Sequence, residues 1–255
     1  MKKYLILITV LITNFSFGQN IEIDSLFSNF KQKSFYGKIN PAEIELEKYQ
    51  KIIIPKLVEM LKDTSFVKLT DTADLIYPGS TKFYGHGHFV PYDMDWISVR
   101  SGWLLEELTF QDFGYKSSEV NDEILFKLAK ENYREYLQNG EYELNWTNTT
   151  TKEKIKEYRK ILSVKTENWW KKNKDNWSRF NAIKEALKSN DENRLSNVFQ
   201  YLRYGKTICD NLNETSYKRE IKPLILLLKE TNKFPDIQIQ IKLLLESSIS
   251  PKIIN

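Results

Sequence analysis

The chain of 255 residues contains a single cysteine, Cys209. One thiol cannot form a disulfide within the chain, so the folded protein must be stable through apolar packing alone. We expect Cys209 itself to be a small buried apolar residue. Disulfide-stapled architectures are thereby excluded.

Histidine is almost as rare, because His86 and His88 are the two in the sequence. This scarcity excludes most nucleophile–base arrangements, and the sequence has no Gly-x-Ser-x-Gly elbow. Gly205-Lys206-Thr207 resembles the end of a phosphate-binding loop, but Gln200 stands where such a loop needs glycine. We assign no catalytic residue and expect no cofactor.

Long apolar runs are also missing. Tyr4–Ile12 is a compact apolar run that follows Lys2 and Lys3 and precedes Ser16-Phe17-Gly18. A positive head, a short apolar run and small residues at the end are the pattern of a secretory signal peptide. A membrane-spanning helix needs about twenty apolar residues. We therefore expect a signal peptide over residues 1–18, a secreted or periplasmic chain over residues 19–255, and no stable membrane insertion.

Neither positive nor negative charge dominates the sequence. The sequence has 38 lysines and arginines against 34 acidic residues, a net charge of +4 that falls to +2 without Lys2 and Lys3. So small an imbalance gives no general attraction to nucleic acid or to anionic lipid. Segment 152–184 is locally basic and contains Trp169, Trp170 and Trp177. It could bind a polyanion or a sugar, although core tryptophans beside solvated lysines are the favoured interpretation.

The apolar residues that are present recur at helical spacing, in pairs of segments. Two segments share the spacing i, i+3, i+4, i+7, namely Ile54, Leu57, Val58, Leu61 and Ile221, Leu224, Ile225, Leu228. Their partner segments share a longer spacing, namely Ile97, Ser101, Leu104, Leu105, Leu108 and Ile237, Ile241, Leu244, Leu245, Ser248. A third pair, separated by Asn190-Asp191, contains Phe180, Ile183, Leu187 and then Leu195, Val198, Phe199, Leu202. These repeated pairs predict an all-α fold.

Helix boundaries can be predicted at several places. Asn40-Pro41-Ala42-Glu43 predicts a helix start, with Asn40 as the N-cap and Pro41 in the first position. That helix should continue to about Lys62 and kink at Pro55. Further helices are predicted over residues 118–138 and 151–175, whereas 142–146 is the one short strand candidate.

Two segments carry a family resemblance. The segment from Ile54 to Asp63 resembles the first helix and turn aspartate of a HEAT-type repeat, and Val99-Arg100 with the following helix resembles its second helix. The stretch from Leu108 to Tyr115 resembles a tail found after such helices in bacterial HEAT-like proteins. The resemblance implies a short α-solenoid of HEAT-like αα-hairpins in a single domain. The sequence departs from the family pattern at two long insertions, at about 64–95 and 116–165. Such scaffolds present binding surfaces and serve many unrelated functions.

The insertion over residues 64–95 is the most unusual region, because loops beyond about 15 residues are often functional. Its candidate binding residues are Tyr84, His86, His88, Tyr92 and Asp95. In an extended segment the two histidines point the same way and could hold a metal ion, with Asp93 or Asp95 as an oxygen ligand. The favoured alternative is an aromatic loop that plugs the edge of a helical layer.

These observations predict an exported helical-repeat protein that acts as a protein-binding or scaffolding module. The expected partner is another protein, not nucleic acid. Two alternatives remain open. One is a metal-dependent hydrolase centred on His86 and His88, and the other is a periplasmic antitoxin or immunity protein.

Overall fold

The computed structural model describes residues 21–32, 36–65, 67, 74–75, 83–84, 96–115, 149–205, 207 and 209–246. Over these residues the protein is all-α, as predicted. The helices are residues 21–31, α2 (Tyr36–Glu47), the 3-10 helix η1 (Gln50–Ile53), α3 (Ile54–Met60), α4 (Ile97–Thr109), α6 (Thr149–Asn173), α7 (Arg179–Leu187), α8 (Glu192–Tyr204), α9 (Glu214–Ser216), the π-helix η3 (Tyr217–Ile221), α10 (Lys222–Thr231) and α11 (Pro235–Glu246).

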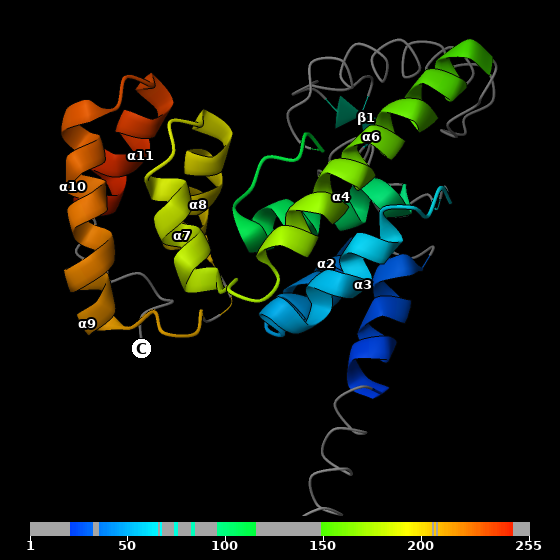
Figure 1. Cartoon of the computed structure of the whole chain (residues 1–255), viewed down its shortest axis with the longest axis horizontal. Helices are drawn as coiled ribbons and strands as arrows, with labels where there is room; N and C mark the ends of the chain where they lie inside the picture. The colour runs from blue at the N-terminus through cyan, green and yellow to red at the C-terminus, as the bar shows by residue number, and fades with distance from the viewer. Residues whose placement is uncertain are drawn as a thin grey trace, which may run out of the picture.

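The helices form pairs that pack one after another along the chain. α3 contacts α4, α7 contacts α8, and α10 contacts α11. Successive pairs also touch, because α4 contacts both α7 and α8, α7 contacts α10, and α8 contacts α11. Figure 1 shows the α7–α8 and α10–α11 pairs side by side at one end of the molecule, with α2, α3 and α4 at the other. The long helix α6 contacts α3.

The predicted apolar stripes form the core. Ile54, Leu57, Leu104 and Leu108 have no exposed surface, and Ile183, Val198, Ile225 and Ile241 are equally enclosed in the later pairs. Leu224 and Leu245 are partly buried against the same continuous cluster. Each stripe is thus covered by the neighbouring helices, and the helical spacing in the sequence is confirmed as the pattern of burial.

The start of α2 differs from the prediction. α2 begins at Tyr36, so Asn40 is not its N-cap and Pro41 lies inside the helix. Ile39 and Leu46 on this helix are completely buried, whereas Pro41 is on the exposed side. Burial of these apolar residues outweighs the one backbone hydrogen bond that proline removes.

The predicted continuous helix to Lys62 is also interrupted earlier than expected. The chain turns at Lys48–Tyr49, and Gln50 adopts a left-handed backbone conformation with φ 44°. Pro55 lies in the first turn of α3, where its missing N–H has no helical partner to lose. The predicted kink at Pro55 is therefore wrong, because Pro55 lies at the start of α3 and not inside a continuous helix.

The two ends of the first insertion lie side by side and are joined by backbone hydrogen bonds. The Ile97 amide donates to the Ser65 carbonyl at 3.1 Å, and the Ser98 amide donates to the Asp63 carbonyl at 3.2 Å. Between them, β1 (Asp74–Leu75) and β2 (Phe83–Tyr84) form an antiparallel two-residue ladder. Strands this short leave no alternating pattern in a sequence, so none was predicted here. The α3–α4 pair is closed at its turn despite the insertion.

Some of the other predicted boundaries fall on described residues and can be tested, and the rest lie outside them. The helix predicted over residues 151–175 is confirmed as α6. The polar turn at Asn190-Asp191 is confirmed as well, because Asp191 is the N-cap of α8 and its side chain accepts a hydrogen bond from the Arg194 amide. The helix at 118–138, the strand at 142–146 and the signal peptide at 1–18 lie outside the described residues.

Candidate functional site

The sequence-predicted binding residues fall almost entirely outside the described structure. Tyr84 belongs to β2, where its backbone pairs with Asp74. The other candidates are not described, namely His86, His88, Tyr92, Asp93 and Asp95. Elsewhere, among the residues that the structure does describe, no group of three or more His, Cys, Asp or Glu side chains could hold a metal ion. The metal hypothesis for the insertion is thus left as a prediction.

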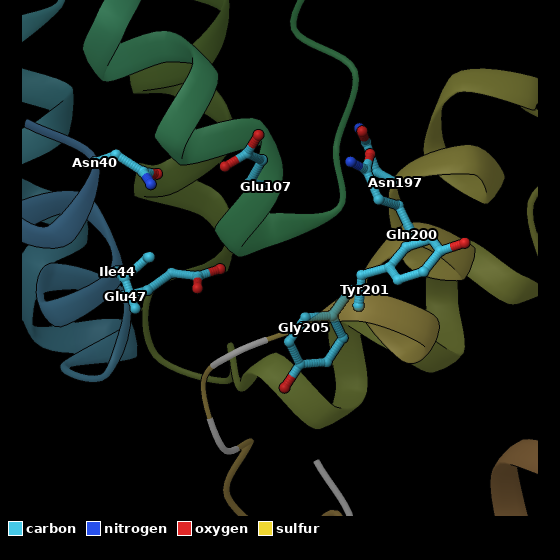
Figure 2. Close-up of a pocket in the computed structure, with 9 residues that line it drawn as sticks. Asn40, Ile44, Glu47, Glu107, Asn197, Gln200, Tyr201 and Gly205 are labelled. Carbon is cyan, nitrogen blue, oxygen red and sulfur yellow. The ribbon is translucent and has the colours of Figure 1, made fainter. Parts of the chain in front are cut away.

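A groove lined by both polar and apolar groups lies at the junction of the first and second helix pairs. Its volume is about 240 Å³. The lining residues are Asn40, Ile44, Glu47, Glu107, Asn197, Gln200, Tyr201, Tyr204 and Gly205. Figure 2 shows Asn40 and Glu47 reaching into this space from α2, with Glu107 entering it from α4 and Asn197, Gln200 and Tyr201 facing it from α8.

Helical periodicity explains both walls of the groove. Asn40, Ile44 and Glu47 are spaced i, i+4, i+7, so they form one stripe along α2. The α8 wall has the spacing i, i+3, i+4, i+7 from Asn197 to Tyr204. The core-facing residues of α8, such as Phe199, occupy a neighbouring stripe of the same helix. Each helix therefore uses one stripe for the core and an adjacent stripe for the groove.

An ion pair fixes Glu47, one of the residues that line the groove. Arg179 at the start of α7 has a fully buried side chain, and it pairs with Glu47, whose side chain stays 14% exposed. Arg179 also donates to the Thr207 hydroxyl at 2.7 Å, and that hydroxyl donates to Glu47 Oε2 at 2.8 Å. The three side chains form a closed triangle of charge-assisted hydrogen bonds, which holds the end of α2 against α7.

Tyr201 connects this ion pair to α8. Its ring lies under the Arg179 guanidinium, 4.2 Å from the ring centroid, and its hydroxyl donates to the Thr207 carbonyl at 2.9 Å. Burial raises the pKa of the Tyr201 hydroxyl far above its ordinary value, although the Arg179 charge opposes the shift. Tyr201 is therefore a neutral structural side chain and not a general base.

Gly205 and Thr207 have structural roles that replace the rejected phosphate-loop interpretation. Gly205 follows the last residue of α8, and a Cβ there would lie 2.6 Å from the Tyr201 carbonyl oxygen. Glycine is thus required where the chain passes close to α8.

Burial also raises the pKa of the nearby Cys209 thiol to about 12, as expected for a buried apolar cysteine.

The charged residues buried inside α4 also serve the fold. Arg100 donates to the Phe30 carbonyl at 2.5 Å and to the Val67 carbonyl at 3.1 Å. Glu106 accepts three backbone hydrogen bonds at 2.9 Å, from the amides of residues 113, 114 and 115. These contacts tie the N-terminal helix and the tail of α4 to the core, so both charges are used by the fold itself.

The tail after α4 positions α8 above the groove. The Arg194 Nε donates to the Phe110 carbonyl at 3.0 Å, and the Asn193 amide group donates to Asp112 at 2.9 Å. Phe110 itself is left-handed, with φ 52°, which turns the chain away from α4. The first turn of α8 is thereby held next to the end of α4, where Glu107 lies.

The basic segment 152–184 is mostly structural over its described part. Trp170 and Trp177 are 9% exposed and belong to the core, while Trp169 is partly buried and packs edge-on against Phe113 at 5.3 Å. The Trp170 and Trp177 rings are 6.3 Å apart and also meet edge to face. The favoured interpretation as core tryptophans is confirmed for these residues.

A second, more open cavity of about 430 Å³ lies beside the turn before α9. Several of its polar groups already bond to one another. Asn213 and Ser216 form a reciprocal capping box, and Glu220 pairs with Lys184 and Arg219. This cavity is therefore a weaker candidate than the groove.

Comparisons with known proteins add no relative. No known family, curated protein or solved structure matches this chain. Within the described residues, no helix is both long enough and apolar enough to cross a membrane. α6, with 25 residues, is long enough to cross a membrane, but charged side chains occur along its whole length.

Sequence reasoning missed the groove residues for identifiable reasons. Asn40 fits a helix cap by its local pattern, and Glu47 is one charged residue among many in the sequence. Asn197, Gln200 and Tyr204 lie beside the apolar stripe of α8, where polar residues are ordinary. The sequence shows only that the groove residues of α2 and those of α8 each recur at helical spacing. This spacing indicates a shared groove only when the structure shows that both helices line it.

Proposed function

We propose that this chain is an exported HEAT-like helical repeat that binds another protein through the groove between α2, α4 and α8. The consecutive packing of the α3–α4, α7–α8 and α10–α11 pairs supports the HEAT-like part of the proposal. The closed turn between Asp63 and Ser98 supports it too, because the insertion is then an addition to an ordinary hairpin. Export rests on the pattern of residues 1–18 in the sequence.

The groove is the observation that carries the binding role. Its volume of about 240 Å³ is below the roughly 300–1,000 Å³ typical of small-molecule and cofactor sites. A space of this size accepts one or two side chains of a partner. The buried charges nearest to it, Arg179 and Glu106, are already bonded within the fold. The arrangement therefore favours recognition of a protein surface over chemistry on a small substrate.

Photo-cross-linking in the producing cell tests this role. The photoreactive residue p-benzoyl-phenylalanine is placed at Gln200, which is exposed at the groove, or at Lys229, which is exposed on α10. We expect a discrete protein adduct from position 200 and none from position 229. A second substitution, Glu107→Arg, should fill the groove and remove the adduct. Equal adducts from both positions, or none from position 200, would overturn the proposal.

Export has a separate test. Mass spectrometry of the protein from its native host should show a mature N-terminus near Gln19. Recovery of the intact chain with Lys2 and Lys3 from the cytoplasmic fraction would contradict export while leaving the binding role open to the cross-linking test.

A further inference from the structure

The helices of the α10–α11 pair are apolar on more than one side. Leu224–Leu228 in α10 are five consecutive apolar residues, and they encircle the helix because one turn takes about 3.6 residues. Leu243–Leu245 cover most of a turn near the end of α11. A helix that is apolar all round is typical of a helix that other segments cover on every side.

The described residues fully cover one side of each of these helices. Ile225 and Ile241 have no exposed surface, and their helices contact α7 and α8 respectively. Away from these contacts, Leu227 is 56% exposed and Ile239 is 55% exposed. Ile239 and Leu243 are spaced i, i+4, so they form one exposed stripe on the side of α11 opposite Ile241. We call these two residues the outer stripe.

The position of the pair makes this exposure unusual. Figure 1 shows α10 and α11 at one end of the molecule, beyond α7 and α8. In proteins built of stacked helix pairs, the pair at an end ordinarily has a polar outer face, because that face meets water. The outer stripe is apolar instead, which indicates that a further apolar segment covers it.

The sequence directly after α11 has the composition of such a segment. Residues 247–255 lie outside the described residues and have one charged side chain, Lys252. Nine extended residues span at most about 30 Å. Ile239 lies only about 10 Å along the helix axis from Glu246, the last residue of α11. The segment can therefore reach the whole outer stripe, and it contains three isoleucines, namely Ile249, Ile253 and Ile254.

We propose that residues 249–254 fold back along α11 and cover the outer stripe. The tether favours this segment over a second copy of the chain. A segment joined to α11 through two residues is present at an effective concentration of millimolar order, which a separate molecule does not reach at ordinary protein concentrations. The inference concerns a different surface from the groove and does not depend on the proposed function.

A double-mutant cycle in the full chain, measured by urea unfolding, tests the inference. One variant is Ile239→Ser in the outer stripe, and the other replaces both Ile253 and Ile254 with serine. If the segment covers the stripe, Ile239→Ser should raise the equilibrium constant of unfolding about tenfold in the parent chain. In the background without the two isoleucines, the same substitution should raise it by less than about twofold, because the contact is already lost.

Val164→Ser in α6 is the matched control, because Val164 is also an exposed aliphatic residue but lies on a different helix. Its effect on unfolding should be the same in both backgrounds. Equal effects of Ile239→Ser in the two backgrounds would overturn the inference, since the outer stripe would then have no contact with the isoleucines of the segment.

Sedimentation velocity distinguishes this cover from a second copy of the chain. We expect Ile239→Ser to leave the oligomeric state of the protein unchanged. A parent dimer that Ile239→Ser dissociates would show that another molecule covers the outer stripe, and the inference would be wrong.

Discussion

Glu47 in α2 and Arg179 in α7 form a buried ion pair although 132 positions separate them in the sequence. The pair joins the N-terminal helices to the second helix pair, and Glu47 also lines the groove. Arg179 has no exposed surface, so its charge depends on Glu47 and on the Thr207 hydroxyl. Removal of one partner from such a pair leaves an uncompensated charge in the interior, which is costly.

Gly102 in α4 provides a prediction with an unusual sign. In an ordinary helix interior, Gly→Ala stabilises a protein by about 0.5–1 kcal/mol. Here a Cβ would lie 2.2 Å from Cγ of Tyr115. We therefore expect Gly102→Ala to lower the free energy of unfolding by about 1–3 kcal/mol, because it overpacks the contact. Urea unfolding measures the change.

A rescue variant isolates the cause. In a Tyr115→Ala background the ring is absent, so Gly102→Ala should become neutral or stabilising. If Gly102→Ala is equally destabilising in both backgrounds, the close approach of Tyr115 is not the reason for glycine at this position.

The burial of α4 could be predicted from the sequence, but the hydrogen bonds of the tail that follows it could not. Ile97, Leu104 and Leu108 follow a local helical period, and a local period is visible without knowledge of the partner helix. The role of Glu106 depends on three amides that follow a left-handed turn at Phe110, and the resemblance of Leu108–Tyr115 to a HEAT-like tail predicts neither that turn nor these hydrogen bonds. In the sequence alone, Glu106 is therefore indistinguishable from the other polar residues of this helix.

Glu106 supports the second prediction. Its carboxylate accepts hydrogen bonds from three successive amides at 2.9 Å and is 1% exposed. Glu106→Gln keeps an acceptor oxygen but loses the charge, so we expect the free energy of unfolding to fall by about 1–3 kcal/mol. The neighbouring Glu107→Gln is the matched control, because Glu107 is partly exposed. Equal losses from the two variants in urea unfolding would contradict the assigned role.

The groove shows why the site was harder to predict than the fold. Its two walls come from α2 and α8, which are far apart in the chain, and neither wall has an unusual sequence. Asn40 also fits a helix cap by local pattern, until the burial of Ile39 and Leu46 extends α2 back to Tyr36. Tertiary contacts, which periodicity does not report, decide both features.

Cys209 gives the third prediction. Its pKa is raised from 9.0 to about 12 by burial, and 1% of the residue is exposed. The native protein should react slowly with a disulfide reagent at mildly alkaline pH and rapidly in guanidinium chloride. Fast labelling of the native protein, at the rate of the unfolded chain, would contradict the buried placement.

The same shift fixes the sign of a pH dependence. Because the folded state favours the neutral thiol, the contribution of Cys209 to stability is complete below the unfolded pKa and is lost as the pH rises from 9.0 to about 12. Cys209→Ala should make the decline in stability over this range less steep. Parallel curves for the two proteins would show that another group is responsible.

The metal hypothesis for the insertion has its own test. If His86 and His88 hold an ion, zinc or manganese should raise the melting temperature by several degrees, because a ligand that binds only the folded state stabilises it. The double variant His86→Ala, His88→Ala should not respond. An unchanged melt of the parent protein would remove both the metal site and the hydrolase alternative.

The Glu47–Arg179 pair joins the end of α2 to the start of α7, and Glu47 also lines the groove. A double-mutant cycle on Glu47→Gln and Arg179→Met measures this contact directly by urea unfolding. We predict a coupling energy of about 1–3 kcal/mol, as found for residues in one buried hydrogen-bond network. Additivity within about 0.3–0.5 kcal/mol would show that the two residues are not in contact, and the placement of α2 beside α7 would then be wrong.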